Sequence, residues 1–323
     1  MATNITGLGT TFNLPNYTGE LFQFGQNDTP FLNMIGGIAG GNMPVVQSTE
    51  FAMGQGYKLN EAAQPAISES ASATAPTATG YVRSQETNVV QIFQRSIKVS
   101  YSKMGDVNTI AGINVQGQIQ PVTNEKDFQI TANLKQIAKD ANYTFLHGAY
   151  NKATKDTEVN KTRGILTAIT TKVVNGHASS AVKLTKELLQ ELFRNCANDG
   201  FDWSNSVLFA DAYNKQLISE IYGYAPQDRN IGGLNIKQIE TDFGNVMVAF
   251  EPTMKGTLGL FDMNKIKPVF RNIVGKGAGI FYEDLAKTGA AESGQLYGEM
   301  GLDYGSESFH GKIANLTTAP ANT

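Results

Sequence analysis

Residues 45–103 place the strongest constraint on how this chain can fold. Both ends of the segment, residues 45–53 and 81–101, are rich in the β-branched and aromatic side chains that are typical of strands. The stretch between them, residues 61–80, consists mostly of Ala, Ser, Thr and Pro and has almost nothing to bury. Ordinary hairpins close in about 2–5 residues, and a much longer loop is usually functional or disordered. Because such a long hairpin cannot build its own core, it must be flexible or rest on another molecule. This favours a role in assembly over a role in catalysis.

The composition is that of a globular, lightly charged chain. Of the 323 residues, 41% are hydrophobic and 17% are charged, which is the opposite of the balance in disordered chains. The length allows one large core or two smaller ones. The 33 glycines, together with many small and hydroxyl-bearing residues, favour sheets, turns and extended arms over a helical bundle.

Charge, cysteine content and hydropathy exclude several classes of function. A net charge of −3 argues against strong general binding to nucleic acid. Cys196 is the only cysteine, so neither an intrachain disulfide nor a Cys-based zinc site can form. The sequence has no signal-peptide pattern and no apolar run near the ~18 residues that a membrane span requires. We therefore expect no membrane partner, and synthesis in a reducing cytoplasm.

Two helices are predicted in the first half of the chain. The N-terminal part predicts an extended arm with one short helix at 28–37, capped by Asp28 or Thr29 and with Pro30 in its first turn. A much longer helix is predicted at about 123–149, with a length of roughly 40 Å. Apolar or small residues recur along it at helical spacing and predict one buried stripe. The stripe consists of Phe128, Thr131, Leu134, Ile137 or Ala138, Ala141, Phe145 and Ala149.

Helices and strands alternate in residues 164–262, which predicts a compact α/β unit with its own core. Helices are predicted at 185–198 and 211–218, and strands at 206–210, 236–241, 246–250 and 258–262. Beyond this unit, strands are predicted at 266–270 and 279–282, and an extended segment at 294–318.

No motif for catalysis, cofactor binding or metal binding is evident. The glycine-rich run at 275–279 lacks the spacing and the hydroxyl of a phosphate-binding loop, and Ile280 stands where a dinucleotide fingerprint needs its third glycine. The histidines, His147, His177 and His310, lie far apart in the sequence and lack the spacing of a metal-binding pair. We therefore predict no catalytic, cofactor-binding or metal site, and a protein that is not an enzyme.

Basic residues are concentrated in one part of the chain. Residues 126–163 carry seven basic side chains against four acidic ones. The basic residues are Lys126, Lys135, Lys139, Lys152, Lys155, Lys161 and Arg163. A solvated helix face and a weak phosphate-facing surface both account for this excess.

Several short segments are informative because of the order in which they occur. They are Asp28-Thr29-Pro30-Phe31-Leu32 with Ile35-Gly36, Phe145-Leu146-His147-Gly148, Gly164-Ile165-Leu166, Val207 to Asn214, Gly256 to Asp262, and Leu302-Asp303-Tyr304-Gly305. They accompany an extended arm, a long hairpin with a polar tip, a long helix, an α/β unit and returning strands. This ordered set, which covers nearly the whole chain, resembles the major capsid proteins of tailed bacteriophages with the Hong Kong 97-type fold.

The resemblance implies an α+β fold of the Hong Kong 97 type with named parts. These are an N-terminal arm at 1–44, an extended loop at 45–100 that lies over an adjacent subunit, a peripheral domain at 101–163 and 263–318 that contains the long spine helix, and an axial domain at 164–262 around the capsomer centres.

The same resemblance implies a structural function. Subunits would assemble as hexamers and pentamers into an icosahedral shell around double-stranded DNA, in the host bacterial cytoplasm, and become part of the virion. The implied partners are further copies of the chain, a portal protein and, as an option in the family, a decoration or cement protein. Some members begin with a helical scaffolding segment, whereas this chain starts close to its arm. We therefore expect a separate scaffolding protein.

The resemblance also suggests residues for two kinds of contact. Charged residues of the extended loop are expected to contact neighbouring subunits, namely Lys58, Glu61, Glu69, Arg83 and Glu86. Three lysines of the spine helix, Lys126, Lys135 and Lys139, are expected to face packaged DNA without sequence specificity. A Lys–Asn crosslink, known in the type member of the family, is not expected here. Lys58 is the only lysine in residues 45–97, and no acceptor environment is evident.

Three alternative functions stay open at the level of sequence. An encapsulin-like nanocompartment shell has the same fold but encloses cargo enzymes, and its arm region is shorter and differently organised. An α/β enzyme would use residues 164–262 and would need a pocket with converging polar groups. A surface adhesin of a phage or bacterium is the third. A discrete monomer with a pocket would favour the enzyme, and a projecting arm at 45–100 favours a shell.

Overall fold

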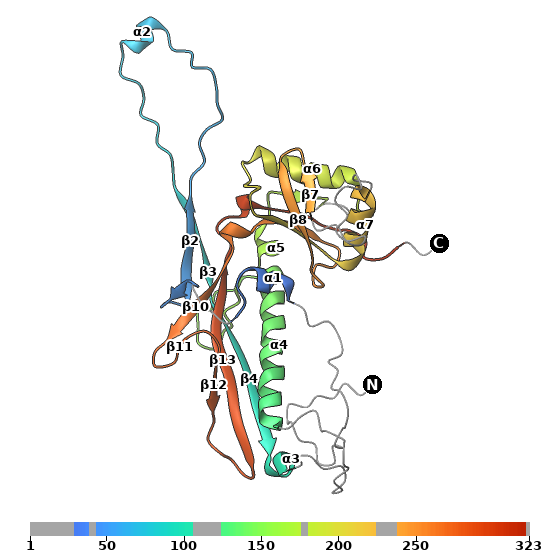
Figure 1. The fold of residues 1–323 in the computed structure, drawn as a ribbon. Helices are drawn as coiled ribbons and strands as arrows, with labels where there is room; N and C mark the ends of the chain where they lie inside the picture. The colour runs from blue at the N-terminus through green and yellow to red at the C-terminus, as the bar shows by residue number, and fades with distance from the viewer. Residues whose placement is uncertain (1–28, 39–42, 106–123, 176–179, 224–237, 321–323) are drawn as a thin grey trace.

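The computed structural model describes residues 29–38, 43–105, 124–175, 180–223 and 238–320. These residues form an elongated body, a compact α/β unit at one end of it, and a hairpin that projects beyond both (Figure 1). Helices and sheets are both present, which confirms the predicted α+β class. Most of the predicted N-terminal arm, residues 1–28, lies outside the described residues.

The elongated body is built around one long strand, β13 (Ala291–Asp303). On one side, β13 pairs antiparallel with β4 (Gln91–Ser100) along the whole length of β4. On the other side, it pairs with β12 (Phe281–Asp284) and then with β10 (Lys267–Ile273). The short strands β1 (Val45–Val46) and β11 (Gly277–Ala278) both pair with β10. The strands predicted at 266–270 and 279–282 are therefore confirmed with shifted ends.

The predicted hairpin of residues 45–103 is shorter than expected. Only β2 (Glu50–Gly56) and β3 (Ser84–Val89) form a two-stranded ribbon, with an irregularity in register between Ala52 and Gln55. The chain then leaves the ribbon, because Phe93, Ile97 and Val99 of β4 are buried against the body. Strand pattern identifies such a segment as β, but the partner strand is decided by where its apolar face is buried.

The distal part of the hairpin, residues 57–83, is exposed throughout, as its composition predicts. At its far end lies a short helix that was not predicted, α2 (Glu69–Ser72), whose first turn is capped by the hydroxyl of Ser68. Another unpredicted short helix, α3 (Tyr101–Gly105), follows β4 at the opposite end of the body (Figure 1).

The long helix α4 (Glu125–His147) confirms the prediction to within two residues at each end. It begins where the side chain of Asn124 accepts hydrogen bonds from the backbone N–H groups of Lys126 and Asp127. It ends at Gly148, whose backbone lies against Gly164: a Cβ at Gly164 would meet the Gly148 nitrogen at 2.5 Å. This close approach requires glycine and closes the loop of residues 149–163.

The predicted buried stripe of α4 is correct only between Ile137 and Phe145. Ile137, Ala141 and Phe145 are buried, as expected. Phe128 and Leu134 are more than one-third exposed, and Thr131 and Ala149 are exposed as well. The reason is geometric: with 3.6 residues per turn, successive steps of three residues drift around the helix, so Phe128 lies roughly opposite Ile137 and cannot share its buried face.

The α/β unit contains a mixed sheet with strand order β5-β14-β9-β6-β8-β7. Its strands are β5 (Val173–Val174), β6 (Ser206–Ala210), β7 (Gln238–Thr241), β8 (Gly244–Phe250), β9 (Leu258–Asp262) and β14 (His310–Ile313). Helices α6 (Lys186–Asn198) and α7 (Ala212–Tyr222) pack against it through residues such as Leu189, Leu192 and Ile218. The predicted helices and strands of residues 185–262 are thus confirmed with small shifts at their ends.

One strand of this sheet differs from the predicted grouping. β14 was expected with the returning strands of 263–318, but it pairs with β9 and β5 inside the α/β unit. Gly311 explains the fit, because a Cβ there would meet Cys196 Sγ and Leu192 Cδ1 of α6 at 2.8 Å. Nothing local in residues 310–313 indicates which of two sheets they join.

His310 is completely buried in the same strand. Its Nε2–H donates to the Tyr304 carbonyl oxygen at 2.8 Å, and its ring stands edge-on to Phe261 with centroids 5.8 Å apart. Nδ1 has no hydrogen-bond partner among the described residues. Burial lowers the pKa of His310 to about 4.

His310 predicts a loss of stability in mild acid. In the unfolded chain a histidine takes up its proton near pH 6.5, whereas folded His310 takes it up only near pH 4. The free energy of unfolding should therefore fall as pH drops from about 6.5 to 4, by up to about 3 kcal/mol. The His310→Gln variant has an amide that can still donate to the Tyr304 carbonyl. Its free energy of unfolding, measured with urea at several pH values, should not show this fall between about pH 6.5 and 4.

The control for this measurement is His147→Gln. Burial also lowers the pKa of His147. This variant should therefore lose the pH dependence of unfolding free energy that is due to His147 and keep the dependence that is due to His310. The prediction would be contradicted if the free energy of unfolding changed with pH in the same way in the wild type and in His310→Gln.

Candidate assembly surfaces

The described residues offer little for catalysis. They contain no group of three or more His, Cys, Asp or Glu side chains that could hold a metal ion. Burial raises the pKa of Cys196 to about 11, so its sulfur is a protonated thiol at neutral pH. None of the helices in the described part of the chain has the length and apolar character needed to cross a bilayer.

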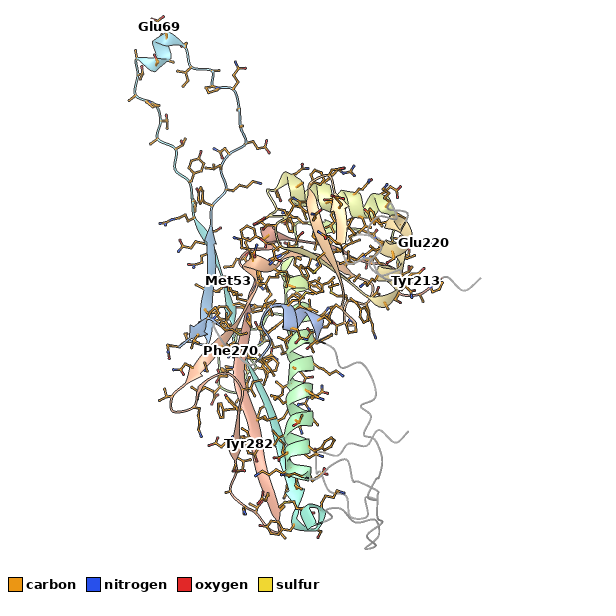
Figure 2. The ribbon with its side chains drawn as sticks, viewed as in Figure 1. Met53, Glu69, Tyr213, Glu220, Phe270 and Tyr282 are labelled. Carbon is orange, nitrogen blue, oxygen red and sulfur yellow. The ribbon has the colours of Figure 1, made fainter. Side chains whose placement is uncertain are left out.

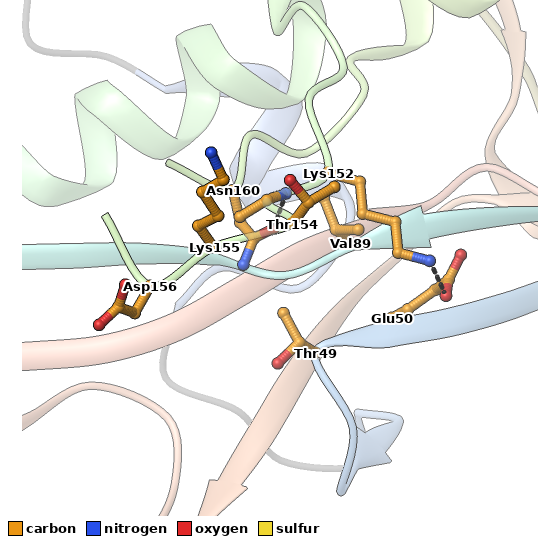
Figure 3. Close-up of a pocket in the computed structure, with 9 residues that line it drawn as sticks. Thr49, Glu50, Val89, Lys152, Thr154, Lys155, Asp156 and Asn160 are labelled. Carbon is orange, nitrogen blue, oxygen red and sulfur yellow. Dashed lines mark hydrogen bonds and ion pairs between the residues drawn. The ribbon is translucent and has the colours of Figure 1, made fainter. Parts of the chain in front are cut away.

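A shallow pocket of about 290 Å³ lies where the loop of residues 149–163 meets the hairpin (Figure 3). Its most prominent contact is an exposed ion pair, in which Lys152 Nζ lies 2.6 Å from Glu50 Oε2. The hydrogen bond between them raises the pKa of Lys152 and lowers that of Glu50. Among the remaining lining residues, Thr49, Thr154, Lys155, Asp156 and Asn160 supply hydroxyl, charged and amide groups without a nucleophile–base pair, and Val89 and Ala153 are apolar.

The base of the hairpin is held to the body by Asn88, which is fully buried. Its Nδ2 donates to the backbone oxygens of Arg163 and Leu302, at 3.2 and 2.8 Å. Its Oδ1 accepts from the backbone N–H groups of Val89 and Arg163. One side chain thus joins the hairpin, the loop after α4 and the end of β13.

The distal hairpin exposes large apolar side chains. They are Tyr57 at 65%, Leu59 at 60%, Ile67 at 71%, Tyr81 at 54% and Val82 at 86% exposure. By contrast, Met53 near the base is only 2% exposed, and Glu69 marks the far tip (Figure 2). Several exposed large apolar side chains on one projecting element are typical of a contact surface for another protein.

The predicted subunit-contact residues fall into two groups. Lys58, Glu61, Glu69 and Arg83 all lie exposed on the distal hairpin. Glu86 instead lies at the base, where its Oε2 accepts from the Tyr304 hydroxyl at 3.0 Å and lies 3.8 Å from Arg163 Nη1. Glu86 therefore serves contacts within the chain, which its place in the sequence did not indicate.

The three lysines predicted to face DNA are not on one surface. Lys126 Nζ lies 3.0 Å from Asp284 Oδ1 and 3.2 Å from Glu292 Oε2, and its hydrogen bond to Asp284 is the main reason that its pKa is raised. Lys135 and Lys139 are one turn apart on α4, and the helical repeat of 3.6 residues places Lys126 on the side roughly opposite to Lys135.

Sequence reasoning missed a buried polar junction between the body and the α/β unit. Glu251 follows β8 and is completely buried, as is Asn142 of α4 at 1% exposure. Asn142 Nδ2 donates to Glu251 Oε1 at 2.9 Å. Two signals were available in the sequence: an amide within the apolar stripe of the long helix, and a carboxylate directly after a buried strand.

The short helix α1 (Pro30–Met34) completes this junction. Pro30 occupies the first turn, as predicted, but Thr29 does not cap the helix with its side chain. Instead, the backbone N–H of Phe31 donates to Glu251 Oε2 at 3.2 Å, and that of Leu32 donates to Asn142 Oδ1 at 2.9 Å. Residues more than a hundred positions away thus supply the cap, which local sequence cannot reveal.

Comparison with known proteins gives one family and one fold. The family model of the SU10 major capsid protein matches residues 4–317. No curated protein sequence is significantly similar to the chain.

Solved structures give further matches over nearly the whole chain. The capsid of cyanophage A-1(L) is 10% identical and has a TM-score of 0.62, with 95% of this chain and 97% of that one covered. The capsid of Myoviridae phage XM1 is 12% identical, with a TM-score of 0.56 and coverage of 92% and 95%. The holo-SrpI encapsulin complex of Synechococcus elongatus is 8% identical, with a TM-score of 0.52 and coverage of 87% and 88%. These likenesses confirm the predicted Hong Kong 97-type fold.

Asn88 predicts a large effect from a small truncation at the hairpin base. Asn88→Ala would remove the side-chain partner of four backbone groups: the N–H of Val89 and the C=O of Leu302 in buried hydrogen bonds, and the N–H and C=O of Arg163 in part-buried ones. The free energy of unfolding should fall by about 2–4 kcal/mol, measured by urea unfolding of free subunits.

A matched variant, Asn60→Ala, changes an exposed residue of the distal hairpin and should stay within about 0.5 kcal/mol of the wild type. Equal effects of the two substitutions would rule out an anchoring role for Asn88.

Proposed function

Because the chain belongs to the SU10 major capsid protein family, we propose that it assembles as hexamers and pentamers into a closed icosahedral shell around the double-stranded DNA of a tailed phage. The match of the family model to residues 4–317 carries this proposal. The family consists of major capsid proteins, so this chain is a shell-forming structural protein and part of a virion. The capsid fold shared with cyanophage A-1(L) and phage XM1 supports the proposed assembly from hexamers and pentamers.

The parts of the chain take the roles that the resemblance assigns. We assign residues 1–44 to an N-terminal arm, 45–100 to an extended loop, 164–262 to an axial domain, and 101–163 with 263–318 to a peripheral domain. The pairing of β14 with β9 supports moving residues 310–313 from the peripheral to the axial domain.

The distal hairpin supplies the contact between subunits. It projects from the body (Figure 1), and its apolar residues, such as Ile67 and Val82, are exposed in the single chain. A second copy of the chain is the partner that a homo-oligomeric shell offers. In this arrangement Lys58, Glu61, Glu69 and Arg83 lie at the rim of the contact, where charges select the partner and its register.

The interior surface makes only weak contact with DNA. Lys135 and Lys139 share one face of α4 and are the lysines that we assign to phosphate contacts. A net charge of −3 is consistent with an inner shell surface that binds the enclosed DNA only weakly. Assembly takes place in the host bacterial cytoplasm, with a separate scaffolding protein, a portal and, as an option, a decoration protein as partners. The protein has no catalytic activity and needs no cofactor.

An encapsulin-like shell is the second candidate, favoured by the shared fold with the SrpI encapsulin. The two functions differ in what the shell encloses. Electron microscopy of the purified chain, alone and co-expressed with neighbouring gene products, tests both. Closed shells that contain DNA would support the phage capsid, and shells that contain an enzyme would support the encapsulin. A monomer under all conditions would refute both.

Val82 predicts a loss of assembly without a loss of folding. Since its side chain is 86% exposed, Val82→Asp should change the free energy of unfolding of the subunit by no more than about 0.5 kcal/mol. If Val82 is buried between subunits, the added carboxylate should lower the yield of shells by more than about tenfold. Sucrose-gradient sedimentation measures this yield.

The nearly isosteric variant Val82→Thr is the control and should assemble. Wild-type yields of shells from Val82→Asp would place this residue outside the contact between subunits.

The lysines of α4 predict two different effects. The double variant Lys135→Glu/Lys139→Glu should retain less DNA in purified shells as salt is raised, because two phosphate contacts are lost. Lys126→Gln should leave DNA retention unchanged and should lower the free energy of unfolding by about 1 kcal/mol, because its ion pairs with Asp284 and Glu292 are partly exposed. Equal retention of DNA in all three kinds of shell would remove Lys135 and Lys139 from the DNA-facing surface.

A further inference from the structure

We propose that Glu251 is a positioning residue for assembly: its carboxylate sets the angle between the α/β unit and α4, and this angle sets the curvature of the shell. The inference rests on the proposed function, since only an assembled shell has a curvature. Here the junction is defined as the side chains of Phe31, Asn142, Glu251 and Thr253 together with the backbone of α1.

The carboxylate of Glu251 is fixed relative to the sheet of the α/β unit. Glu251 directly follows β8, and its backbone N–H donates to the Ala210 carbonyl at the end of the neighbouring strand β6, at 2.9 Å. Oε1 accepts from the Thr253 hydroxyl at 2.8 Å and from the Thr253 backbone N–H at 3.3 Å. These contacts within the unit fix the orientation of the carboxylate, and so the directions from which its two oxygens can accept further hydrogen bonds.

The same two oxygens accept hydrogen bonds from two segments outside the α/β unit, α4 and α1. Asn142 of α4 donates to Oε1, and the backbone N–H of Phe31 in α1 donates to Oε2. Asn142 also accepts from the Leu32 N–H, so the three segments are joined pairwise. His147, one turn and a half further along α4, adds a contact of 2.9 Å between Nε2 and the Thr253 carbonyl.

The apolar packing around the junction does not select an angle by itself. Phe31 lies between α4 and the sheet, with its ring 5.5 Å from that of Phe209 and 6.0 Å from that of Phe261. Hydrophobic burial of this kind is non-directional and tolerates small rotations. The hydrogen bonds of a buried carboxylate are directional, and losing one leaves a buried polar group unpaired. The polar contacts therefore select one orientation among those that the apolar contacts allow.

A change in this angle would affect the shell more than the subunit. Every subunit in a closed shell repeats the same contacts by symmetry, so a small change in subunit shape recurs at each of them and alters whether and where the surface closes. In this respect Glu251 differs from residues whose loss only destabilises the fold.

The test compares Glu251→Gln with a matched control. Glutamine has the same shape but offers one acceptor oxygen in place of two, so one of the donors from α1 or α4 meets an NH₂ group. The control is Glu220→Gln on α7, a carboxylate of the same α/β unit that lies away from the junction (Figure 2). Wild type and variants are assembled in parallel, and cryo-electron microscopy measures the distribution of particle diameters. Circular dichroism confirms that each subunit is folded.

A third variant tests positioning separately from stability. Glu251→Gln/Asn142→Asp exchanges the carboxylate and the amide across the same hydrogen bond. The carboxylate that this variant introduces on α4 can still accept from the Leu32 N–H and from the new amide. We expect Glu251→Gln to broaden or shift the distribution of diameters or to prevent closure, Glu220→Gln to match the wild type, and the exchange variant to restore most particles to the wild-type diameter.

Several results would overturn the inference. One is a folded Glu251→Gln chain that forms shells of wild-type diameter, and another is a defect in closure that the exchange variant fails to restore. If Glu251→Gln does not fold, Thr253→Ala replaces it, since it removes only the hydroxyl donor to Oε1. Wild-type diameters from Thr253→Ala would then overturn the inference, and shifted diameters would support it. Failure of the wild-type chain to form any shell would instead refute the proposed function.

Discussion

The buried carboxylate of Glu251 is the interaction on which the arrangement of the two halves of the molecule depends. Removing a carboxylate from water costs several kcal/mol unless hydrogen bonds replace its hydration. Glu251 accepts hydrogen bonds from Phe31, Asn142 and Thr253, and bonds to a charged group contribute about 1.5–3 kcal/mol each. Since two of these donors belong to α1 and α4, moving either segment away would leave the buried carboxylate without one of the hydrogen bonds that replace its hydration. Glu251 therefore connects the N-terminal segment, the spine helix and the α/β unit, together with the contacts of Asn142 to Leu32 and of His147 to Thr253, while apolar packing surrounds Phe31.

The hairpin divides into a fixed base and an exposed distal part, and this division matches the function of a shell subunit. Asn88 joins the base to β13 and to the loop after α4, so the direction in which the hairpin leaves the body is determined within the chain. Beyond Gly56 and before Ser84 the chain has no core of its own and exposes side chains such as Ile67 and Val82. A segment without a core gains its stability from whatever it covers. The same composition that prevents the distal part from folding alone suits it to a contact repeated between subunits.

Local physical signals account for most of the elements that could be predicted. The helix α6 begins at Thr185, whose hydroxyl accepts from the Leu188 N–H, and its apolar residues repeat at helical spacing. Likewise, β6 is a run of five buried residues that ends at Ala210 and is followed directly by Asp211, the cap of α7. Predictions failed where two partners were equally good on local grounds. Phe128 and Leu134 continue the spacing of three residues that leads to the buried Ile137, but steps of three drift around the helix, so Phe128 lies roughly opposite Ile137 and is exposed. The pattern of β4 is that of a continuing hairpin strand, although β4 pairs with β13 and buries one face under α4. Four of the candidate contact residues, Lys58, Glu61, Glu69 and Arg83, lie exposed on the distal hairpin. The sequence could not show that Glu86 and Lys126 form contacts within the chain.

Composition and spacing are sufficient to establish that residues 61–80 cannot form a core, that residues 164–262 can, and that the chain has no motif for catalysis or metal binding; the ordered set of segments was enough to indicate a capsid fold. These properties are local, because composition, spacing and capping act over a few residues. The folded molecule was needed to show that β14 joins the α/β unit, that His310 is buried as a neutral ring, and that Asn142 and Glu251 cap a helix more than a hundred residues away. Each of these depends on contacts between segments distant in the chain. Which polar group satisfies which buried partner is settled only when the whole core closes around them.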